Sequence, residues 1–362
     1  MLALGGAIGC SGTPSLNVFV PTTITDADAD AAYEAWKTGF LEDCGGGLWR
    51  VRWSQADLTV SEGIAYGMLL TVIHDERTIF DGLWQYYKNN RDDRGLMHWQ
   101  RMGCEGAPSG DNAATDADLD AAMALVMASR RWSTTPYLAD ADTLIRAIQT
   151  YETATGTDGI SLLRPGDAFG PCLNVSYFSP GYYRVFADVV PDQADLWNKL
   201  ADDTYTLIGR AAHGTTGLVP NWCDENGATR PAGPFGCANY TNADLYGSDA
   251  ARTPWRIATD YVWFSTPEAH TWLNKVTSWV KTVGITNVVS SYSLDGTPVG
   301  TSHNIVVVGA FADGAMAYDQ ATADEFTAEA VALPPPTSYF QTNLRALYLL
   351  LPLGRFTPQG GQ

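Results

Sequence analysis

Signals for helix starts recur along the whole chain, whereas signals for strands are few. A helix tolerates proline at its first position, because the N–H that proline lacks would have no partner there. Proline follows serine or threonine at Ser179-Pro180, Thr253-Pro254 and Thr266-Pro267. Near Asp26 a polar cap precedes a stretch that places on one helical face Tyr33, Trp36 and Phe40. These signals predict an all-α fold.

Apolar residues also repeat at helical spacing in three further segments. The stripes are Trp272/Val276/Trp279/Val280, Leu344/Leu347/Tyr348/Leu351 and Leu196/Leu200/Leu207. Loops rich in Gly, Pro and Asn cover residues 218–248 and 287–302, and the second contains the turn signal Asp295-Gly296. No composition break marks a linker and no internal repeat is visible. We therefore expect one large helical domain with functional loops between its helices.

Composition narrows the classes of function. The 362 residues include 22 Lys and Arg against 40 Asp and Glu, which gives a formal net charge of −18. A nucleic-acid-binding surface is basic, so we expect no nucleic-acid partner. Hydrophobic residues make up 45% of the chain, which is enough for a large core. No apolar run approaches the roughly 20 residues that cross a bilayer, so we expect no transmembrane segment.

The six cysteines show no C-x-x-C spacing, which argues against a zinc or redox motif. An even number is typical of disulfides in exported proteins. The simplest pair to predict is Cys223 with Cys237, across a loop that contains Asn226-Gly227, while the other pairings remain open. The five histidines lack the spacing of metal ligands. We expect no cofactor and no catalytic metal; a structural calcium ion held by loop aspartates stays open, although no EF-hand loop is present.

The start of the chain, from Met1 to Cys10, is similar to the end of a secretory signal that lacks its charged beginning. Small residues precede Cys10, as they do at a cleavage site. A disordered end is the alternative interpretation. We expect a secreted protein, with lipid anchoring at Cys10 as a further option.

Three short stretches hold acidic residues among glycine and aromatic residues. They are residues 59–68 around Glu62, residues 114–120 around Asp116, and residues 248–256 around Asp249. Asp116 and Asp120 lie one helical turn apart and repel each other, which a purely structural helix does not need. Acidic residues in such surroundings are candidates for catalysis.

Each stretch also has a structural alternative. Thr59 and Glu62 have the spacing of a capping box, although Gly63 and Gly67 would weaken the helix that it opens. Thr115 with its acidic first turn is typical of a helix N-cap. Asp249 and its neighbour Arg252 would contribute little as a surface ion pair.

Paired carboxyl groups with many aromatic rings, and without a metal or nucleotide motif, are typical of glycoside hydrolysis. One protonated carboxyl group gives its proton to the leaving sugar oxygen, while an ionised one activates water or attacks the anomeric carbon. The chain has 12 Trp, 17 Tyr and 12 Phe. Their faces can stack on the apolar faces of sugar rings.

In order and spacing, the motifs resemble family 8 of the glycoside hydrolases, the group of endoglucanases, chitosanases and xylanases. The resemblance covers the chain from about Thr59 to Tyr261 and leaves a helical remainder compatible with it. It rests on six stretches in order: Thr59-Val-Ser-Glu62-Gly-Ile-Ala-Tyr66-Gly67-Met68, Phe80-Asp-Gly-Leu-Trp84, Leu96-Met-His-Trp99, Ala114-Thr-Asp116-Ala-Asp118-Leu-Asp120, Ser176-Tyr177-Phe178 with Tyr182-Tyr183-Arg184, and Asp249-Ala-Ala-Arg252-Thr-Pro-Trp255-Arg256.

The resemblance implies an (α/α)6 barrel with a long substrate cleft formed by loops. It divides the chain into residues 1–20 as a signal remnant or disordered N-terminus, 21–357 as a single catalytic domain, and 358–362 as a flexible C-terminus. It also implies an inverting mechanism, with Glu62 as general acid and Asp249 as general base. Inversion needs room for a water molecule, so we predict that these carboxyl groups lie roughly 6.5–9.5 Å apart.

The resemblance further implies residues that bind substrate. Asp116 would hold the sugar at the cleavage point, and Arg252 would orient toward the base. Trp99 is similar to a stacking platform for a neighbouring sugar, and Tyr177 to a hydroxyl partner of the attacking water. Phe169 stands where the family often has a stacking tryptophan. Ser248 replaces a tyrosine that commonly precedes the base.

One feature opposes these roles. A helix start stabilises negative charge and would lower the pKa of Glu62, whereas a general acid must stay protonated. We therefore expect burial and the charge of Asp116 to raise that pKa.

The context of the base resembles endo-β-1,4-glucanases, so we expect a β-1,4-linked polysaccharide as substrate: cellulose, carboxymethylcellulose or mixed-linkage glucan. A chitosanase or xylanase of the same family is the alternative, since the negative charge of the chain would attract cationic chitosan. A noncatalytic polysaccharide-binding protein is the alternative from another class. We expect a monomer.

Overall fold

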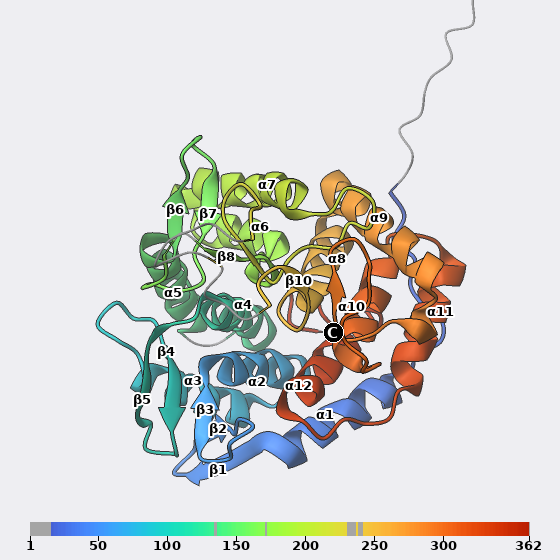
Figure 1. Cartoon of the computed structure of the whole chain (residues 1–362). Helices are drawn as coiled ribbons and strands as arrows, with labels where there is room; N and C mark the ends of the chain where they lie inside the picture. Colours follow the sequence, from blue (N-terminus) through green and yellow to red (C-terminus); the bar gives the residue numbers. More distant parts are fainter. Residues whose placement is uncertain (1–15, 134–135, 171, 230–236, 238–241, 362) are drawn as a thin grey trace, which may run out of the picture.

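The computed structural model describes residues 16–361 except 134–135, 171, 230–236 and 238–241. Twelve α-helices dominate this described part of the chain (Figure 1). Their bounds are α1 Asp26–Phe40, α2 Ser61–Ile73, α3 Arg77–Asn89, α4 Thr115–Trp132, α5 Tyr137–Tyr151, α6 Pro180–Val189, α7 Ala194–Ala211, α8 Thr253–Phe264, α9 Pro267–Val283, α10 Ile305–Ala315, α11 Gln320–Ala332 and α12 Tyr339–Tyr348.

The even-numbered helices contact one another in a closed circuit. Helix α2 packs on α4, α4 on α6, α6 on α8, α8 on α10 and α10 on α12, and α12 returns to α2. Each odd-numbered helix packs against an even-numbered neighbour in sequence, α1 against α12 across the ends of the chain. Figure 1 shows α1, α5, α7, α9 and α11 at the rim of the molecule. The chain therefore alternates between an inner and an outer layer of helices.

Burial separates the two layers. Every residue of α10 is buried, and so is every residue of α2 except Glu62. A helix that is apolar on all sides must be enclosed by other elements. The outer helices are amphipathic instead; α9, for example, buries Trp272, Val276 and Val280.

The predicted helix starts are confirmed. Helix α6 begins at Pro180, α9 begins at Pro267, and α8 begins at Thr253 with proline as its second residue. The expected stripe on α7 is wrong at its first position, because Leu196 is 50% exposed. Trp197 next to it is buried instead.

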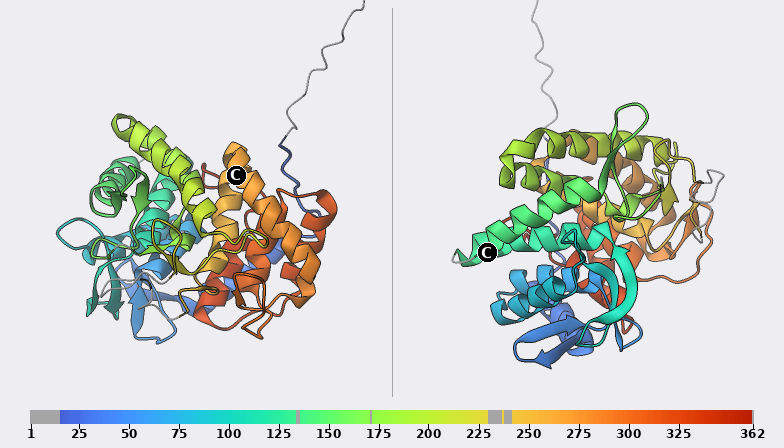
Figure 2. Two further views of the ribbon diagram at one scale, coloured as in Figure 1. Left: turned by 45° about the horizontal axis from the view of Figure 1, so that its top comes forward. Right: turned by 90° about the vertical axis from the view of Figure 1, so that its left-hand side faces the viewer.

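The described connections also contain eleven short strands in five small antiparallel sheets, which the prediction of an all-α fold did not include. They are β1 Leu41–Gly45, β2 Leu48–Val51, β3 Leu58–Val60, β4 His98–Met102, β5 Ala107–Ala113, β6 Thr153–Thr155, β7 Ser161–Leu163, β8 Leu173–Asn174, β9 Trp222–Cys223, β10 Leu245–Tyr246 and β11 Tyr292–Ser293. Most are too short for an alternating pattern to be visible in sequence. Figure 2 shows β4–β5 and β6–β7 extending beyond the helices.

Two disulfides join residues in these connections, Cys44–Cys104 and Cys172–Cys237. The predicted pair of Cys223 with Cys237 is therefore wrong. Strand β9 pairs with β8 so that Cys223 lies opposite Leu173, and Cys237 bonds to Cys172 just before β8. Burial raises the pKa of the Cys223 thiol to about 12, so this free thiol stays protonated.

Two sequence expectations concern the ends and the membrane. Cys10, the expected anchoring residue, lies outside the described residues. Among the helices that the structure describes, none combines the length and the apolar character that a membrane span requires.

Candidate active site

Glu62 is the second residue of α2, directly after β3. The alternative capping box is wrong, because the Thr59 hydroxyl donates instead to the Val51 carbonyl at 3.0 Å and accepts from Arg50 at 3.1 Å. Glu62 is thus not engaged with Thr59. Its side chain is 19% exposed at the end of an otherwise buried helix.

Asp116 and Asp120 of α4 lie four residues apart, and they bind Arg252 and Arg256, which are also four residues apart. Asp120 binds Arg256 through two hydrogen bonds, at 2.5 and 2.7 Å, and Asp116 accepts from Arg252 at 3.0 Å. The repulsion expected between Asp116 and Asp120 is offset because each has its own cation. The predicted N-cap at Thr115 is wrong, since the cap position is Ala114.

The Arg252 guanidinium gathers the three predicted acids. Its Nη1 donates to Glu62 Oε2 at 2.8 Å and to Asp116 Oδ2 at 3.0 Å, while its Nη2 lies 3.5 Å from Asp249 Oδ1. Nη1 also donates to the Tyr66 hydroxyl at 3.1 Å. The Arg252 side chain is 2% exposed. Three segments far apart in sequence therefore meet at one buried cation.

The electrostatics of this cluster favour a proton on Glu62. Burial raises the pKa of Glu62 to about 7, and the charges of Asp116 and Asp249 act in the same direction. Arg252 lowers it, as does the Tyr339 hydroxyl, which donates to Glu62 Oε1 at 3.2 Å. The net effect is upward, so burial and neighbouring carboxylates outweigh the groups that stabilise the charged form.

Asp249 lies at the start of a short 3-10 turn, Ala250–Arg252, and its side chain is 36% exposed. The Trp222 indole donates to Asp249 Oδ2 at 3.1 Å. Asp249 also lines a cavity of about 420 Å³ together with Asn221, Ser290 and Ser291. This carboxylate is hydrogen-bonded on one side and open to solvent on another.

The remaining predicted residues lie at different places around the cluster. The Tyr177 ring is 5.4 Å from the Arg252 guanidinium, and burial holds the pKa of its phenol well above the ordinary range, so the phenol can donate. Phe169 stacks with Trp222, whose ring is nearly parallel to it at a centroid distance of 6.4 Å. Trp99 lies on β4 beside β3, 40% exposed.

Sequence reasoning assigned no role to three residues of the cluster: Tyr66, which contacts Arg252, and Tyr339 and Trp222, which contact Glu62 and Asp249. Tyr66 lies one helical turn after Glu62, so its position could have been read from helical spacing. Tyr339 and Trp222 come from α12 and β9, and no local spacing links either of them to the acid that it contacts.

A second set of carboxyl groups lies on α4 and at the C-terminal end of α5. Asp118 and Glu152 are fully buried, and the Tyr87 hydroxyl donates to Asp118. Burial raises the pKa of Asp118 to about 7 and that of Glu152 well above its ordinary value, and the charge of Asp118 raises the latter further. We call Asp118 and Glu152 the buried carboxyl pair. The low polarity of the surroundings favours the protonated form of both carboxyl groups.

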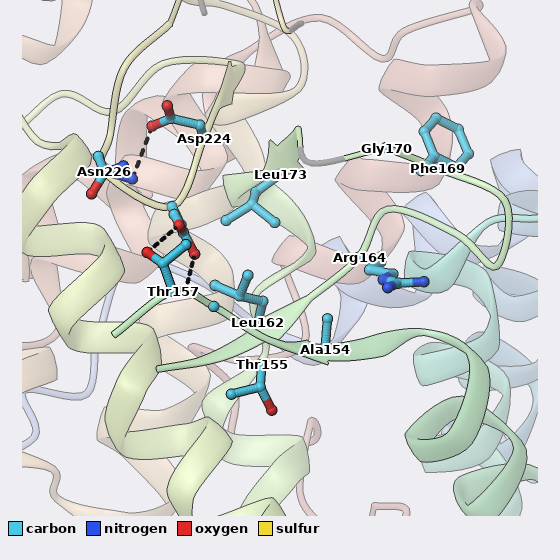
Figure 3. Close-up of a pocket in the computed structure, with 12 residues that line it drawn as sticks. Ala154, Thr155, Thr157, Leu162, Arg164, Phe169, Gly170, Leu173, Asp224 and Asn226 are labelled. Carbon is cyan, nitrogen blue, oxygen red and sulfur yellow. Dashed lines mark hydrogen bonds between the residues drawn. The ribbon is translucent and has the colours of Figure 1, made fainter. Parts of the chain in front are cut away.

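A cavity of about 480 Å³ lies between the β6–β7 segment and residues 224–226. Figure 3 shows the residues that line it. Phe169 lies at one end of it and Arg164 borders it. On the other side Thr157 donates to the Glu225 carboxylate through its backbone N–H at 3.1 Å and its hydroxyl at 2.7 Å. Phe169 thus borders this cavity and stacks with Trp222, which donates to Asp249.

Comparison with known proteins agrees with this geometry. The family profile described as "Glycosyl hydrolases family 8" matches residues 14–353. The chain belongs to glycosyl hydrolase family 8. In the part of this family 8 chain that the structure describes, no group of three His, Cys, Asp or Glu residues could hold a metal ion.

Relatives of this family 8 chain include glucan hydrolases. Endoglucanase A of Acetivibrio thermocellus is 33% identical over 98% of this chain and 77% of that protein. Endoglucanase 2 of Ruminiclostridium josui is 35% identical over 90% of this chain and 70% of that protein. Among solved structures, a beta-1,3-1,4-glucanase from Paenibacillus sp. X4 aligns with a TM-score of 0.84 and 27% identity, over 94% of this chain and 96% of that one.

Proposed function

We propose that this protein is an inverting endo-β-1,4-glucanase, with Glu62 as general acid and Asp249 as general base. The observation that carries the proposal is the gathering of Glu62, Asp116 and Asp249 around Arg252, with the pKa of Glu62 raised to about 7. A noncatalytic sugar-binding surface needs aromatic rings but no carboxyl group held near neutrality. The supporting fold is an (α/α)6 barrel, with the even-numbered helices inside and a loop-lined substrate cleft at one end.

The reaction follows from the two protonation states. Protonated Glu62 gives its proton to the glycosidic oxygen as the bond from that oxygen to the anomeric carbon breaks. Water attacks the anomeric carbon from the opposite face, and ionised Asp249 accepts a proton from it. The product carries the inverted anomeric configuration. Proton exchange with solvent then restores both carboxyl groups.

The surrounding groups act on orientation and charge. Asp116 would bind the hydroxyl groups of the sugar at the cleavage point, and Arg252 holds the acids in one frame. Tyr177, still protonated, would donate to or accept from the attacking water. Trp99 and Phe169 would stack on sugar rings farther along the chain of the substrate.

The choice of a glucan is supported by the named activities of relatives, which include two endoglucanases and a beta-1,3-1,4-glucanase. The β-1,4 linkage rests on the resemblance of the sequence around Asp249 to endo-β-1,4-glucanases. A reducing-end xylose-releasing exo-oligoxylanase at 26% identity is also among the relatives, so xylan is a competing substrate. Chitosan is the other, because the net charge of −18 would attract a cationic polysaccharide. Secretion is part of the proposal, because disulfides form and persist in oxidising compartments.

A reducing-sugar assay on carboxymethylcellulose, mixed-linkage glucan, chitosan and xylan tests the substrate. Glu62→Gln and Asp249→Asn should each lower turnover by roughly a hundredfold or more, because a positioned acid or base contributes about that much. Binding of the polysaccharide should persist. Glu76→Gln, which removes a surface carboxylate paired with Lys37, is the control.

Proton NMR of the newly released anomer tests inversion. An inverted product is expected; a retained configuration would exclude the proposed mechanism. Activity on none of the four polysaccharides would favour a binding protein, and full turnover in Asp249→Asn would remove that residue as base.

A further inference from the structure

Asn221 and Trp222 are consecutive in the chain and hold Asp249, the proposed base, at the backbone beside it and at its side chain. Asn221 Oδ1 accepts from the backbone N–H groups of Gly247 and Ala250, at 3.1 and 2.9 Å. These two residues flank Ser248-Asp249. Trp222 Nε1 donates to the Asp249 carboxylate itself at 3.1 Å. Two consecutive residues thus hold both the loop and the side chain of Asp249.

Trp222 is held firmly in place. It is 9% exposed, and β9 pairs with β8 so that Trp222 lies opposite Asn174. Its backbone N–H donates to the Ala243 carbonyl at 3.1 Å. Its side chain packs in a small apolar cluster with Cys172, Cys237, Ala243 and Phe169, and a disulfide joins the two cysteines. The indole is therefore a rigid donor.

Asp249 has no comparable support from Arg252. The Nη2 contact is 3.5 Å long, and Nη1 of the same guanidinium is already bonded to Glu62 and Asp116. A carboxylate that is 36% exposed can rotate into solvent unless a second group fixes it. The Trp222 bond fixes Oδ2, and the Arg252 contact lies at the other oxygen, Oδ1.

We propose that Trp222 is a positioning residue that fixes the Asp249 carboxylate in the orientation needed to accept a proton from water. The inference rests on the proposed function and adds a residue to it. Geometry of this kind affects the chemical step more than substrate binding, because a base displaced by about 1 Å loses the aligned contact with its water.

Trp222→Phe removes the N–H and keeps an aromatic ring. We expect kcat to fall roughly 10- to 100-fold, the range for a lost hydrogen bond to a charged group, with KM changed less than about twofold. The matched control is Trp84→Phe. Trp84 is 3% exposed and donates to the Asp140 carboxylate at 2.8 Å between α3 and α5, so it loses the same kind of bond away from the acids. This control should keep wild-type kcat.

The decisive measurement repeats Trp222→Phe in the Asp249→Asn background. A residue that acts through the base should cost nothing further once the base is absent. An equal loss in both backgrounds, or a change in KM alone, would overturn the proposal. Full activity of Asp249→Asn alone would instead refute the proposed function.

Trp222→His supplies a second variant with a ring N–H. Recovery of kcat relative to Trp222→Phe supports the donor role, and equal loss in both variants opposes it. If Trp222→Phe does not fold, Trp222→Ala with and without Asp249→Asn carries the same double-mutant comparison, and additive losses there refute the proposal.

Discussion

Replacing Asp116 with asparagine removes a negative charge beside Glu62 and leaves the shape of the side chain unchanged. Both carboxyl groups contact Arg252 Nη1, at 2.8 and 3.0 Å. Their oxygens therefore lie within about 6 Å of each other, where two charges repel by about 3 kcal/mol at an effective dielectric constant near 20. That energy corresponds to about two pH units, and solvent screening brings the expected shift to about one.

The substitution changes the pKa of Glu62 in two ways, and both changes are downward. Without Asp116 the repulsion that raises the pKa of Glu62 is gone, and Arg252 has one competitor fewer for the Glu62 carboxylate. Both effects favour ionised Glu62. The proposed mechanism needs protonated Glu62, so kcat/KM of the wild-type protein should fall as pH rises through about 7. In Asp116→Asn that fall should begin about one pH unit lower.

The assay is kcat/KM on a soluble β-glucan at constant ionic strength from pH 4 to 9. The quantity to compare is the pH at which kcat/KM falls on the alkaline side of the profile. A general loss of activity from weaker sugar binding would leave that pH unchanged. Asp192→Asn, which breaks a surface ion pair with Arg146, is the control and should leave the limb in place. A limb that stays at the wild-type pH, or moves upward, would refute the assigned electrostatics of Glu62.

Two further predictions concern stability. The buried carboxyl pair binds protons more tightly in the folded chain than in the unfolded chain. The free energy of unfolding should therefore fall as pH rises from about 4.5 through 7. Glu152→Gln should weaken this pH dependence, which urea unfolding at pH 5 and pH 8 would measure. An unchanged pH dependence would contradict the raised pKa values. Removing Cys172–Cys237 by paired alanine substitutions should lower the free energy of unfolding by about 2–4 kcal/mol, because the bond closes a loop with a sequence separation of 65 residues. Cys223→Ala is the control, and an equal loss there would contradict the assigned pairing.

Local chemistry of the chain was enough to locate several of the helices. Proline at helix starts and apolar stripes such as that of α9 act within a few residues, so α6, α8 and α9 could be located without tertiary information. The candidate acids could be identified for a related reason. Glu62, Asp116 and Asp249 stand in unusual local surroundings of glycine and aromatic residues, and the resemblance to a known family depends on such short motifs.

The tertiary structure decided everything that joins distant segments. Only packing brings residues 62, 116 and 249 to one arginine, and the burial there, together with the charges of Asp116 and Asp249, raises the pKa of Glu62. It likewise replaced the expected Cys223–Cys237 pair with Cys172–Cys237, because the pairing of β8 with β9 sets which sulfurs meet. Spacing in sequence controls contacts within a helical turn, whereas contacts between loops depend on the closed packing of all twelve described helices.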